Sequence, residues 1–368
     1  MRSLTVGIGL APGDISLDLG EFHPVSQGGF QLRLELDDDL ITHASPRIGF
    51  MHRGAEKLFE VRDYRQIMML ANRHDWLAPF ASELGIALTL EAAMGITPPP
   101  RSTWIRMLIA EITRINAHLA FLAGSVDPDT ALAARAGRER IAQWMEDVTG
   151  NRVHPMFARI GGVAHDLPAN ALDTAAAIAR DSLQLTPAAR EAIQSGGLAG
   201  LATLTNSDAL GFGTSGPVGH ASGLMNDTRF TTTYMFYSEV DMQPVDAPRA
   251  GDAESRFLQL IGQIELSTHI IDQCIPHLQA SEGEPVNVVL PKVVRAPEGT
   301  NYSWSEGPTG INGWLLVSAG EKTPWRLKLR SASFNNLQAI AHALAGTPLE
   351  KLADAVKSSF IVIGDVDR

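Results

Sequence analysis

The strongest constraint on the fold is a long apolar stripe that follows three consecutive prolines, Pro98 to Pro100. Proline suits the first turn of a helix because its fixed backbone angle matches the helix and its missing N–H is not needed there. After the prolines, apolar side chains recur at the three- and four-residue spacing of one helix face: Trp104, Leu108, Ile112, Ile115, Leu119 and Leu122. We therefore predict a long helix that buries this face.

Two further stripes share this spacing. One is short and runs from Ile141 to Val148, and the other is long and runs from Phe257 to Leu278. Several such helices in one chain bury their apolar faces against one another, as in a helical bundle. The chain has 368 residues, enough for one large or two medium domains.

Strand patterns lie on both sides of these helices. Leu32, Leu34 and Leu36 alternate with polar residues, which is the period of a half-buried strand, and a second short strand follows at Leu40 to Thr42. Near the other end we predict strands and then a helical pair, in this order: Val286 to Leu290, Trp314 to Val317, Trp325 to Leu329, Phe334 to Leu344 and Leu349 to Lys357.

These patterns predict an α+β fold with a central helical bundle and small β-regions near both chain ends. We divide the chain into an N-terminal β-region (1–50), a helical bundle core (51–280) and a C-terminal β-hairpin with helices (281–368).

Composition narrows the functional classes. A net charge of −11 argues against a nucleic-acid binder, because such proteins concentrate basic residues on one surface. No apolar run is long enough for a membrane helix, and the N-terminus lacks the layout of a signal peptide. We therefore expect a cytoplasmic protein that meets a membrane only peripherally or through partners.

Cofactor motifs are missing from the sequence. The single cysteine, Cys274, cannot form an internal disulfide, a four-cysteine zinc site or a self-contained iron–sulfur cluster, and we interpret it as a small buried residue. The run Gly211 to Gly216 resembles a dinucleotide-binding loop, but it follows no convincing strand and, with Pro217 next, we predict that it opens no helix.

Three polar segments could carry chemistry. His23 to Gly29 is either a structural turn or a binding loop that approaches a ligand closely at its glycines. In the segment from Gly49 to Leu58, Arg53 and Lys57 lie on either side of Glu56 in the sequence. These residues form either an ion-pair network or a solvated helix start. Asn72 to Leu77 places His74 beside a carboxylate, which is either a proton-transfer pair or an ordinary surface pair.

These segments resemble, in order, the D-type member of proton-pumping NADH:quinone oxidoreductase, respiratory complex I, a relative of nickel–iron hydrogenase large subunits. His23 to Leu36 is similar to its His-Pro-Ser-Thr-His-Gly loop and the strand after it. Pro46 to Glu60 resembles its Ile-Gly-(Tyr/Phe)-x-His-Arg-Gly-x-Glu-Lys motif, and Asn72 to Pro79 its Asp-Arg-Leu-Asp-Tyr-Leu-Ser-Pro motif. Gly364 to Arg368 is similar to the family's Gly-Glu-Val-Asp-Arg terminus.

The resemblance implies a nickel–iron hydrogenase large-subunit-like fold and a peripheral place on the cytoplasmic face of the cell membrane. It implies a cluster-bearing B-type partner, a C-type subunit and a membrane quinone-channel subunit. Quinone is the implied substrate, while iron–sulfur clusters and NADH are implied in the partners and no cofactor in this chain. Nickel is excluded, because the hydrogenase Cys-x-x-Cys pairs are replaced in regions that here hold Trp76 and Asp365.

In the family that this chain resembles, two side chains hydrogen-bond the two quinone oxygens. They are the second histidine of the His-Pro-Ser-Thr-His-Gly loop and the tyrosine of the Asp-Arg-Leu-Asp-Tyr-Leu-Ser-Pro motif. The aligned residues here are Gln27 and Trp76, of which glutamine cannot relay a proton and tryptophan can donate one N–H. Because quinone reduction consumes two protons, we predict His74 or His52 as the substitute donor.

The resemblance thus implies two overlapping groups of site residues. The implied catalytic residues are Gln27, Trp76 and His74. The implied quinone-binding residues are His23, Gln27, His52, Arg53, Trp76 and Asp127, with Asp129 as the alternative to Asp127 in an ambiguous alignment. Two hypotheses remain open: a working quinone-site subunit that is inactive alone, and a divergent paralogue that acts as a scaffold for such a complex.

Overall fold

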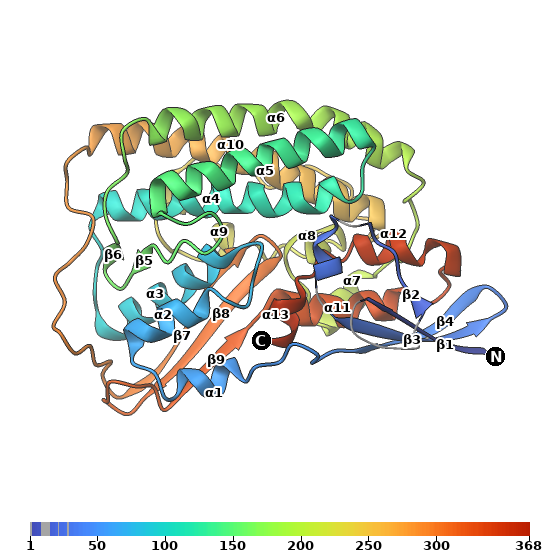
Figure 1. The fold of residues 1–368 in the computed structure, drawn as a ribbon, viewed down its shortest axis with the longest axis horizontal. Coiled ribbons are helices and arrows are strands. Elements are labelled where there is room, and N and C mark those ends of the chain that lie inside the picture. Colours follow the sequence, from blue (N-terminus) through green and yellow to red (C-terminus); the bar gives the residue numbers. More distant parts are fainter. Residues whose placement is uncertain (1, 9–14, 21, 28) are drawn as a thin grey trace.

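A computed structural model describes residues 2–8, 15–20, 22–27 and 29–368, without the side chains of Arg2 and Gln27. Long helices form one layer of the molecule, and two small sheets with shorter helices lie beneath it (Figure 1). No helix in the described part of the chain is both long enough and apolar enough to cross a membrane. The α+β architecture is as predicted.

Four helices form the bundle. They are α4 (Pro100–Ala123), α5 (Pro128–Thr149), α6 (Ala171–Ser195) and α10 (Ala253–Ala280). The predicted stripes in α4, α5 and α10 are buried, so these helix predictions are confirmed. Helix α6 was not predicted, because its buried face consists largely of alanines and Pro187 lies inside it.

The N-terminal sheet has the order β2-β1-β3-β4, made of β1 (Arg2–Ile8), β2 (Ile15–Ser16), β3 (Phe30–Asp37) and β4 (Leu40–Arg47). The alternating leucines of β3 are buried, as predicted. The edge strand β4 also meets a segment more than three hundred residues later. Its Leu40 forms a bridge with Pro348, and Ile41 N donates to Thr347 O at 3.0 Å.

The C-terminal sheet runs β7 (Gly299–Gly307), β8 (Gly310–Ser318) and β9 (Arg326–Arg330), all antiparallel. The predicted hairpin is β8–β9. The predicted strand at 286–290 was wrong: this segment makes one bridge, from Asn287 to Gly162, and Val289 is 99% exposed. Val286 and Leu290 pack against the core, but the segment pairs with no neighbouring strand along its length. The segment lies against the small β5 (Ala158–Arg159) and β6 (Gly162–Val163) hairpin.

Shorter helices fill the space between the sheets and the bundle. In chain order they are η1 (Pro24–Gln27), α1 (Ala55–Phe59), α2 (Tyr64–Ala71), α3 (Pro79–Met94), α7 (Asn206–Gly211), α8 (Gly216–Ala221), α9 (Thr228–Thr231), η2 (Tyr237–Glu239), α11 (Ala332–Ala343), η3 (Leu349–Lys351), α12 (Leu352–Lys357) and α13 (Ile363–Asp367). The predicted helical pair near the end corresponds to α11 and to η3 with α12.

One of these helices corrects a prediction. Helix α8 begins at Gly216 with Pro217 in its first turn, so the expectation that no helix opens there was wrong. Proline is compatible with the first helical turn because no hydrogen bond is lost there. The segment before it is helix α7 and not a strand, so the arrangement still differs from a dinucleotide-binding strand–turn–helix unit.

Candidate functional site

The segment from Phe360 to Arg368 connects the polar loops that the sequence singled out. At one end, the ring of Phe360 packs against Phe121 of α4, with ring centroids 5.3 Å apart. At the other end, Asp365, Asp367 and Arg368 contact loops that come from the first quarter of the chain. In Figure 1 this segment lies at the centre of the molecule, between β9 and α11.

The loop before α1 is held by Asp367. The backbone N–H groups of Gly49 and Met51 donate to its two carboxylate oxygens at 2.7 and 2.8 Å. Nδ1 of His52 lies 2.7 Å from the carbonyl oxygen of Asp367, and the His52 ring is exposed. Arg53 is exposed too, and its guanidinium donates to the carbonyl oxygen of Arg73 at 2.8 Å.

Glu56 resolves the alternatives left open for this loop. It lies in the first turn of α1, and its carboxylate pairs with Arg326, with Lys328 at 3.5 Å and with Arg368 at 3.5 Å. Glu56 is partly buried, so an ion-pair network does form at this helix start, but its partners are not the expected Arg53 and Lys57; Lys57 pairs with Glu60 at 2.6 Å. This network fixes α1 to strand β9.

His74 is buried beside a carboxylate, but the carboxylate is not that of its sequence neighbour. Its Nε2 lies 3.0 Å from Ser82 Oγ and 3.7 Å from Asp365 Oδ1. Burial lowers the pKa of His74 to about 4, although Asp365 acts in the opposite direction. The ring is therefore neutral at pH 7.

Asp75 faces the backbone at the start of α3. Its Oδ1 accepts the N–H groups of Leu77 and Ala78 at 3.1 and 3.0 Å. Burial, together with the charge of Asp365, raises the pKa of Asp75 to about 7. A carboxyl that titrates near neutral pH is suited to exchange protons under physiological conditions.

Trp76 is partly buried, and its ring packs against the backbone of Gly364. A methyl group at position 364 would meet the His74 carbonyl oxygen and would lie only 2.6 Å from Trp76 Cε2. Such approaches are shorter than van der Waals contact. Glycine at position 364 is therefore required for the close packing of these two candidate site residues.

We expect Gly364→Ala to destabilise the chain by about 1–3 kcal/mol, the usual cost of overpacking, and to shift the fluorescence of Trp76. Thermal unfolding and emission spectra of the variant would measure both effects. Gly211→Ala is the matched control, because, apart from its chain neighbours and its own helix backbone, no described atom lies within 4 Å of the methyl group that it adds. Equal midpoints and spectra in the two variants would contradict this packing role.

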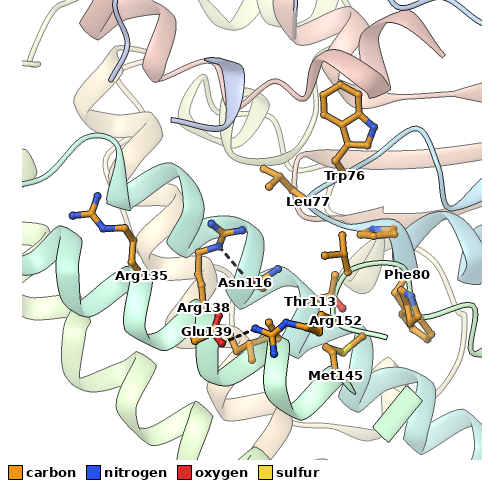
Figure 2. A pocket seen from close by; sticks show the side chains of 15 residues that line it. Trp76, Leu77, Phe80, Thr113, Asn116, Arg135, Arg138, Glu139, Met145 and Arg152 are labelled. Atoms are coloured by element: carbon orange, nitrogen blue, oxygen red, sulfur yellow. Dashed lines mark hydrogen bonds and ion pairs between the residues drawn. The ribbon is translucent and has the colours of Figure 1, made fainter. Parts of the chain in front are cut away.

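A cavity of about 210 Å³ opens beside Trp76 (Figure 2). Its walls come from the Trp76 loop, α3, α4, α5 and the loop after α5. Polar side chains gather on the α5 side: Arg138 Nε donates to Asn116 Oδ1 at 3.3 Å, and Arg152 pairs with Glu139 at 2.5 Å. Figure 2 shows Trp76 at one edge of the cavity, apart from these groups.

His23 lies at the other end of the connecting segment. Its ring is fully buried against Gly124 at the end of α4, and its Nδ1 accepts the Val25 N–H at 3.3 Å. Burial, with a contribution from the Lys357 charge, lowers the pKa of His23 to about 3. The neighbouring Gln27 belongs to η1, and its side chain is outside the described part of the structure.

Asp127 has a structural task. It is the N-cap of α5, and its Oδ1 accepts the N–H groups of Asp129 and Thr130 at 3.1 and 3.0 Å. The backbone hydrogen bond from Thr130 lowers the pKa of this exposed carboxyl. Asp127 does not belong to the walls of the cavity beside Trp76.

Known proteins have similar sequences across the described fold. A family model for the "Respiratory-chain NADH dehydrogenase, 49 Kd subunit" matches residues 129–368. The chain belongs to this family. The membership agrees with the predicted fold, that of nickel–iron hydrogenase large subunits.

Full-length relatives of this 49 kDa-family chain include D-type subunits of NADH-quinone oxidoreductases. The one numbered 2 in Salinispora tropica is 43% identical over all of this chain and 98% of the relative. The one numbered 1 in Streptomyces coelicolor is 44% identical over 99% of this chain and 98% of its own length. The one in Carboxydothermus hydrogenoformans is 34% identical over 96% of this chain and 98% of its own length.

In this 49 kDa-family chain, sequence reasoning missed a buried charge cluster between α4, α9, α10 and β7. Its centre is Glu111, whose oxygens lie 3.1 Å from Arg114 Nε and 3.1 Å from Arg229 Nη1. Tyr237 and Ser267 also donate to Glu111, at 2.7 and 2.6 Å. Burial raises the pKa of Glu111, but the two arginines outweigh it and lower that pKa to about 2.

The same cluster contains a group of ligand-type atoms. One atom each of His220, Asp227 and Glu306 lies within 4.8 Å of the others, and all three residues are buried. Both carboxylate oxygens of Asp227 already accept hydrogen bonds from Arg229, at 3.1 and 2.7 Å. Because Arg229 already neutralises Asp227, we assign no metal to this group.

Proposed function

We propose that the chain is the quinone-site subunit of a complex I-like NADH:quinone oxidoreductase and is inactive alone. It helps electrons pass from a partner's iron–sulfur cluster to quinone, coupled to proton translocation. NADH and the clusters belong to partner subunits, which we propose to be of the B type, the C type and the membrane quinone-channel type. The complex places this chain peripherally on the cytoplasmic face of the cell membrane.

The observation that carries this proposal is the cavity beside Trp76. Trp76 and Leu77 belong to the motif that resembles the family's tyrosine-bearing loop, and both line the cavity. The lining combines apolar side chains with four charged ones, which suits a ligand that has an apolar ring and polar oxygens. The names of the three relatives described above, each a D-type subunit of an NADH-quinone oxidoreductase, point to the same substrate.

Protons for quinone reduction have a source beside this cavity. His74 is next to Trp76 in the chain, and Asp75 titrates near pH 7. Asp365 interacts electrostatically with both His74 and Asp75; because His74 is neutral at pH 7, Asp75 is the group of the three that holds a proton near neutral pH. We propose that this group supplies protons, while Trp76 and Gln27 orient the headgroup and His23, His52, Arg53 and Asp127 lie around the path of the substrate.

Purified complex tests the proposal. We expect it to oxidise NADH when quinone is added, and we expect Trp76→Ala to lower that rate at least about tenfold by removing a wall and a hydrogen-bond donor. Gln27→Ala should also lower the rate. Trp325→Ala is the matched control, since Trp325 is 75% exposed and does not line this cavity. An assembled complex without quinone reductase activity would instead indicate the divergent scaffold.

A further inference from the structure

Arg138 is a partly buried cation that pairs with no carboxylate of the described residues. It projects from α5 into the cavity beside Trp76, and its one hydrogen bond to a described atom is the 3.3 Å bond from Nε to Asn116. No Asp or Glu oxygen of the described residues lies within 4.0 Å of it. Burial lowers the pKa of Arg138, as expected for a charge that has lost water without gaining a counter-ion.

The acidic residue closest in sequence does not compensate it. Glu139 also lines the cavity, but its carboxylate pairs with Arg152 at 2.5 Å. Arg135, one helical turn before Arg138, lies over the ring of Phe22 at 4.8 Å and forms no ion pair with a described carboxylate. The walls thus carry three arginines and one glutamate, a formal charge of +2 in a chain of net charge −11.

Such an arrangement is costly for the fold alone. A cation that leaves water is normally paired, because desolvation of a charge without a partner is unfavourable. Nη1 and Nη2 of Arg138 keep N–H donors that no described protein atom accepts, and a guanidinium presents them in one plane. An oxygen that a ligand brings into the cavity would complete these hydrogen bonds.

The remaining wall residues and the cavity volume indicate the chemical character and the size of such a ligand. Leu77, Phe80 and Met145 are apolar, so the body of the ligand is apolar. A volume of about 210 Å³ is below the roughly 300–1,000 Å³ of pockets for drug-sized ligands, which leaves room for one substituted ring but not for a long tail. A quinone headgroup is such a ring, with carbonyl oxygens at two opposite edges.

We propose that Arg138 binds one carbonyl oxygen of the quinone headgroup in this cavity, with Arg135 adding positive charge nearby. This inference rests on the proposed function. Two electrons from a partner's iron–sulfur cluster and two protons convert quinone to quinol. Arg138 stabilises the negative charge that develops on the bound oxygen and keeps its own proton, because guanidinium does not act as an acid at neutral pH. The protons come from other groups.

The test is Arg138→Gln in the assembled complex, with short-chain ubiquinone and menaquinone analogues as probes. Binding is followed by quenching of Trp76 fluorescence, which Trp76→Phe identifies, and turnover gives KM and kcat. We expect at least about tenfold weaker binding and a matching rise in KM, as for a lost hydrogen bond to a charged group. Arg138→Lys should recover part of the affinity because it keeps the charge.

Stability separates ligand binding from a structural role. Because no described carboxylate pairs with Arg138, its removal should leave the thermal midpoint unchanged or raise it. Arg140→Gln is the matched control from the same helix: Arg140 is exposed, pairs with Asp181 and does not line this cavity, so binding should not change.

Unchanged quinone binding and KM in Arg138→Gln would overturn this inference and leave the proposed function intact. Weaker binding together with a lower thermal midpoint would also overturn it, since Arg138 would then be structural. If the wild-type complex does not reduce quinone, the proposed function fails, but the titration still decides the inference. Quenching that depends on Arg138 would support it, and no quenching of Trp76 by either probe would overturn it.

Discussion

Glu111→Ala is expected to lower the free energy of unfolding by about 3–5 kcal/mol, the cost of breaking a buried charge pair by removing one partner. The substitution leaves Arg114 and Arg229 in the core without their shared carboxylate. It also removes the acceptor of the Tyr237 and Ser267 hydroxyl groups. Urea denaturation of the purified chain, followed by circular dichroism, would measure the shift in midpoint.

Two further variants serve as comparisons for the Glu111→Ala measurement. Glu111→Gln keeps an acceptor for the hydroxyl groups but loses the charge, so its effect should be intermediate. Glu146→Ala removes an exposed partner of Arg152, and changes at exposed ion pairs usually stay within about 0.5 kcal/mol. Should Glu111→Ala unfold at the same urea concentration as Glu146→Ala, the cluster does not stabilise the fold.

The second large effect concerns Glu306 and pH. Burial and the nearby charge of Asp227 raise the pKa of Glu306 from 4.5 to about 8. The folded chain therefore holds this proton more tightly than the unfolded chain does. Its stabilising contribution is fully present below pH 4.5 and is lost as the pH rises to 8, by about 1.4 kcal/mol per pH unit within that window.

Glu306→Gln replaces the protonated carboxyl by an amide that does not titrate. The amide oxygen can still accept the N–H and hydroxyl group of Thr228, which donate to Glu306 at 2.9 and 3.1 Å. We expect the variant to gain stability relative to wild type as the pH rises from 6 to 8. Thermal midpoints at several pH values would measure this gain.

The exposed Glu298 provides the control for this titration, because Glu298→Gln should leave the difference from wild type independent of pH. Parallel pH profiles of wild type and Glu306→Gln would show that Glu306 keeps its proton no more tightly in the folded chain than in the unfolded chain.

Elements with a one-sided apolar pattern were predictable from the sequence. The apolar stripes of α4 and α10 and the alternating leucines of β3 each predict their element from local sequence alone. Helix α3 carries none, because it is buried on nearly all faces between α4 and the β7–β8 hairpin. Strand β7 is rich in polar residues, and only its pairing with β8 makes it a strand.

In the candidate site, too, the local motifs were predictable and the contacts between distant segments were not. Motif resemblance identified His52, His74 and Trp76, but it could not show that the segment from Phe360 to Arg368 connects their loops. Contacts between residues some three hundred positions apart leave no trace in local spacing. For the same reason, the sequence could not predict that Arg138 lines a cavity and pairs with no described carboxylate. Both facts depend on the folded arrangement of α5 and its neighbours.

The bridge between Leu40 and Pro348 sets an order of events during synthesis. Strand β4 emerges early, yet the segment that covers its edge follows about three hundred residues later. At a synthesis rate of about 5–20 residues per second, this delay is on the order of 15–60 s. Until then the edge of β4 is open to pairing with strands of other chains, so the N-terminal sheet is the part of the nascent protein where protection against aggregation is needed.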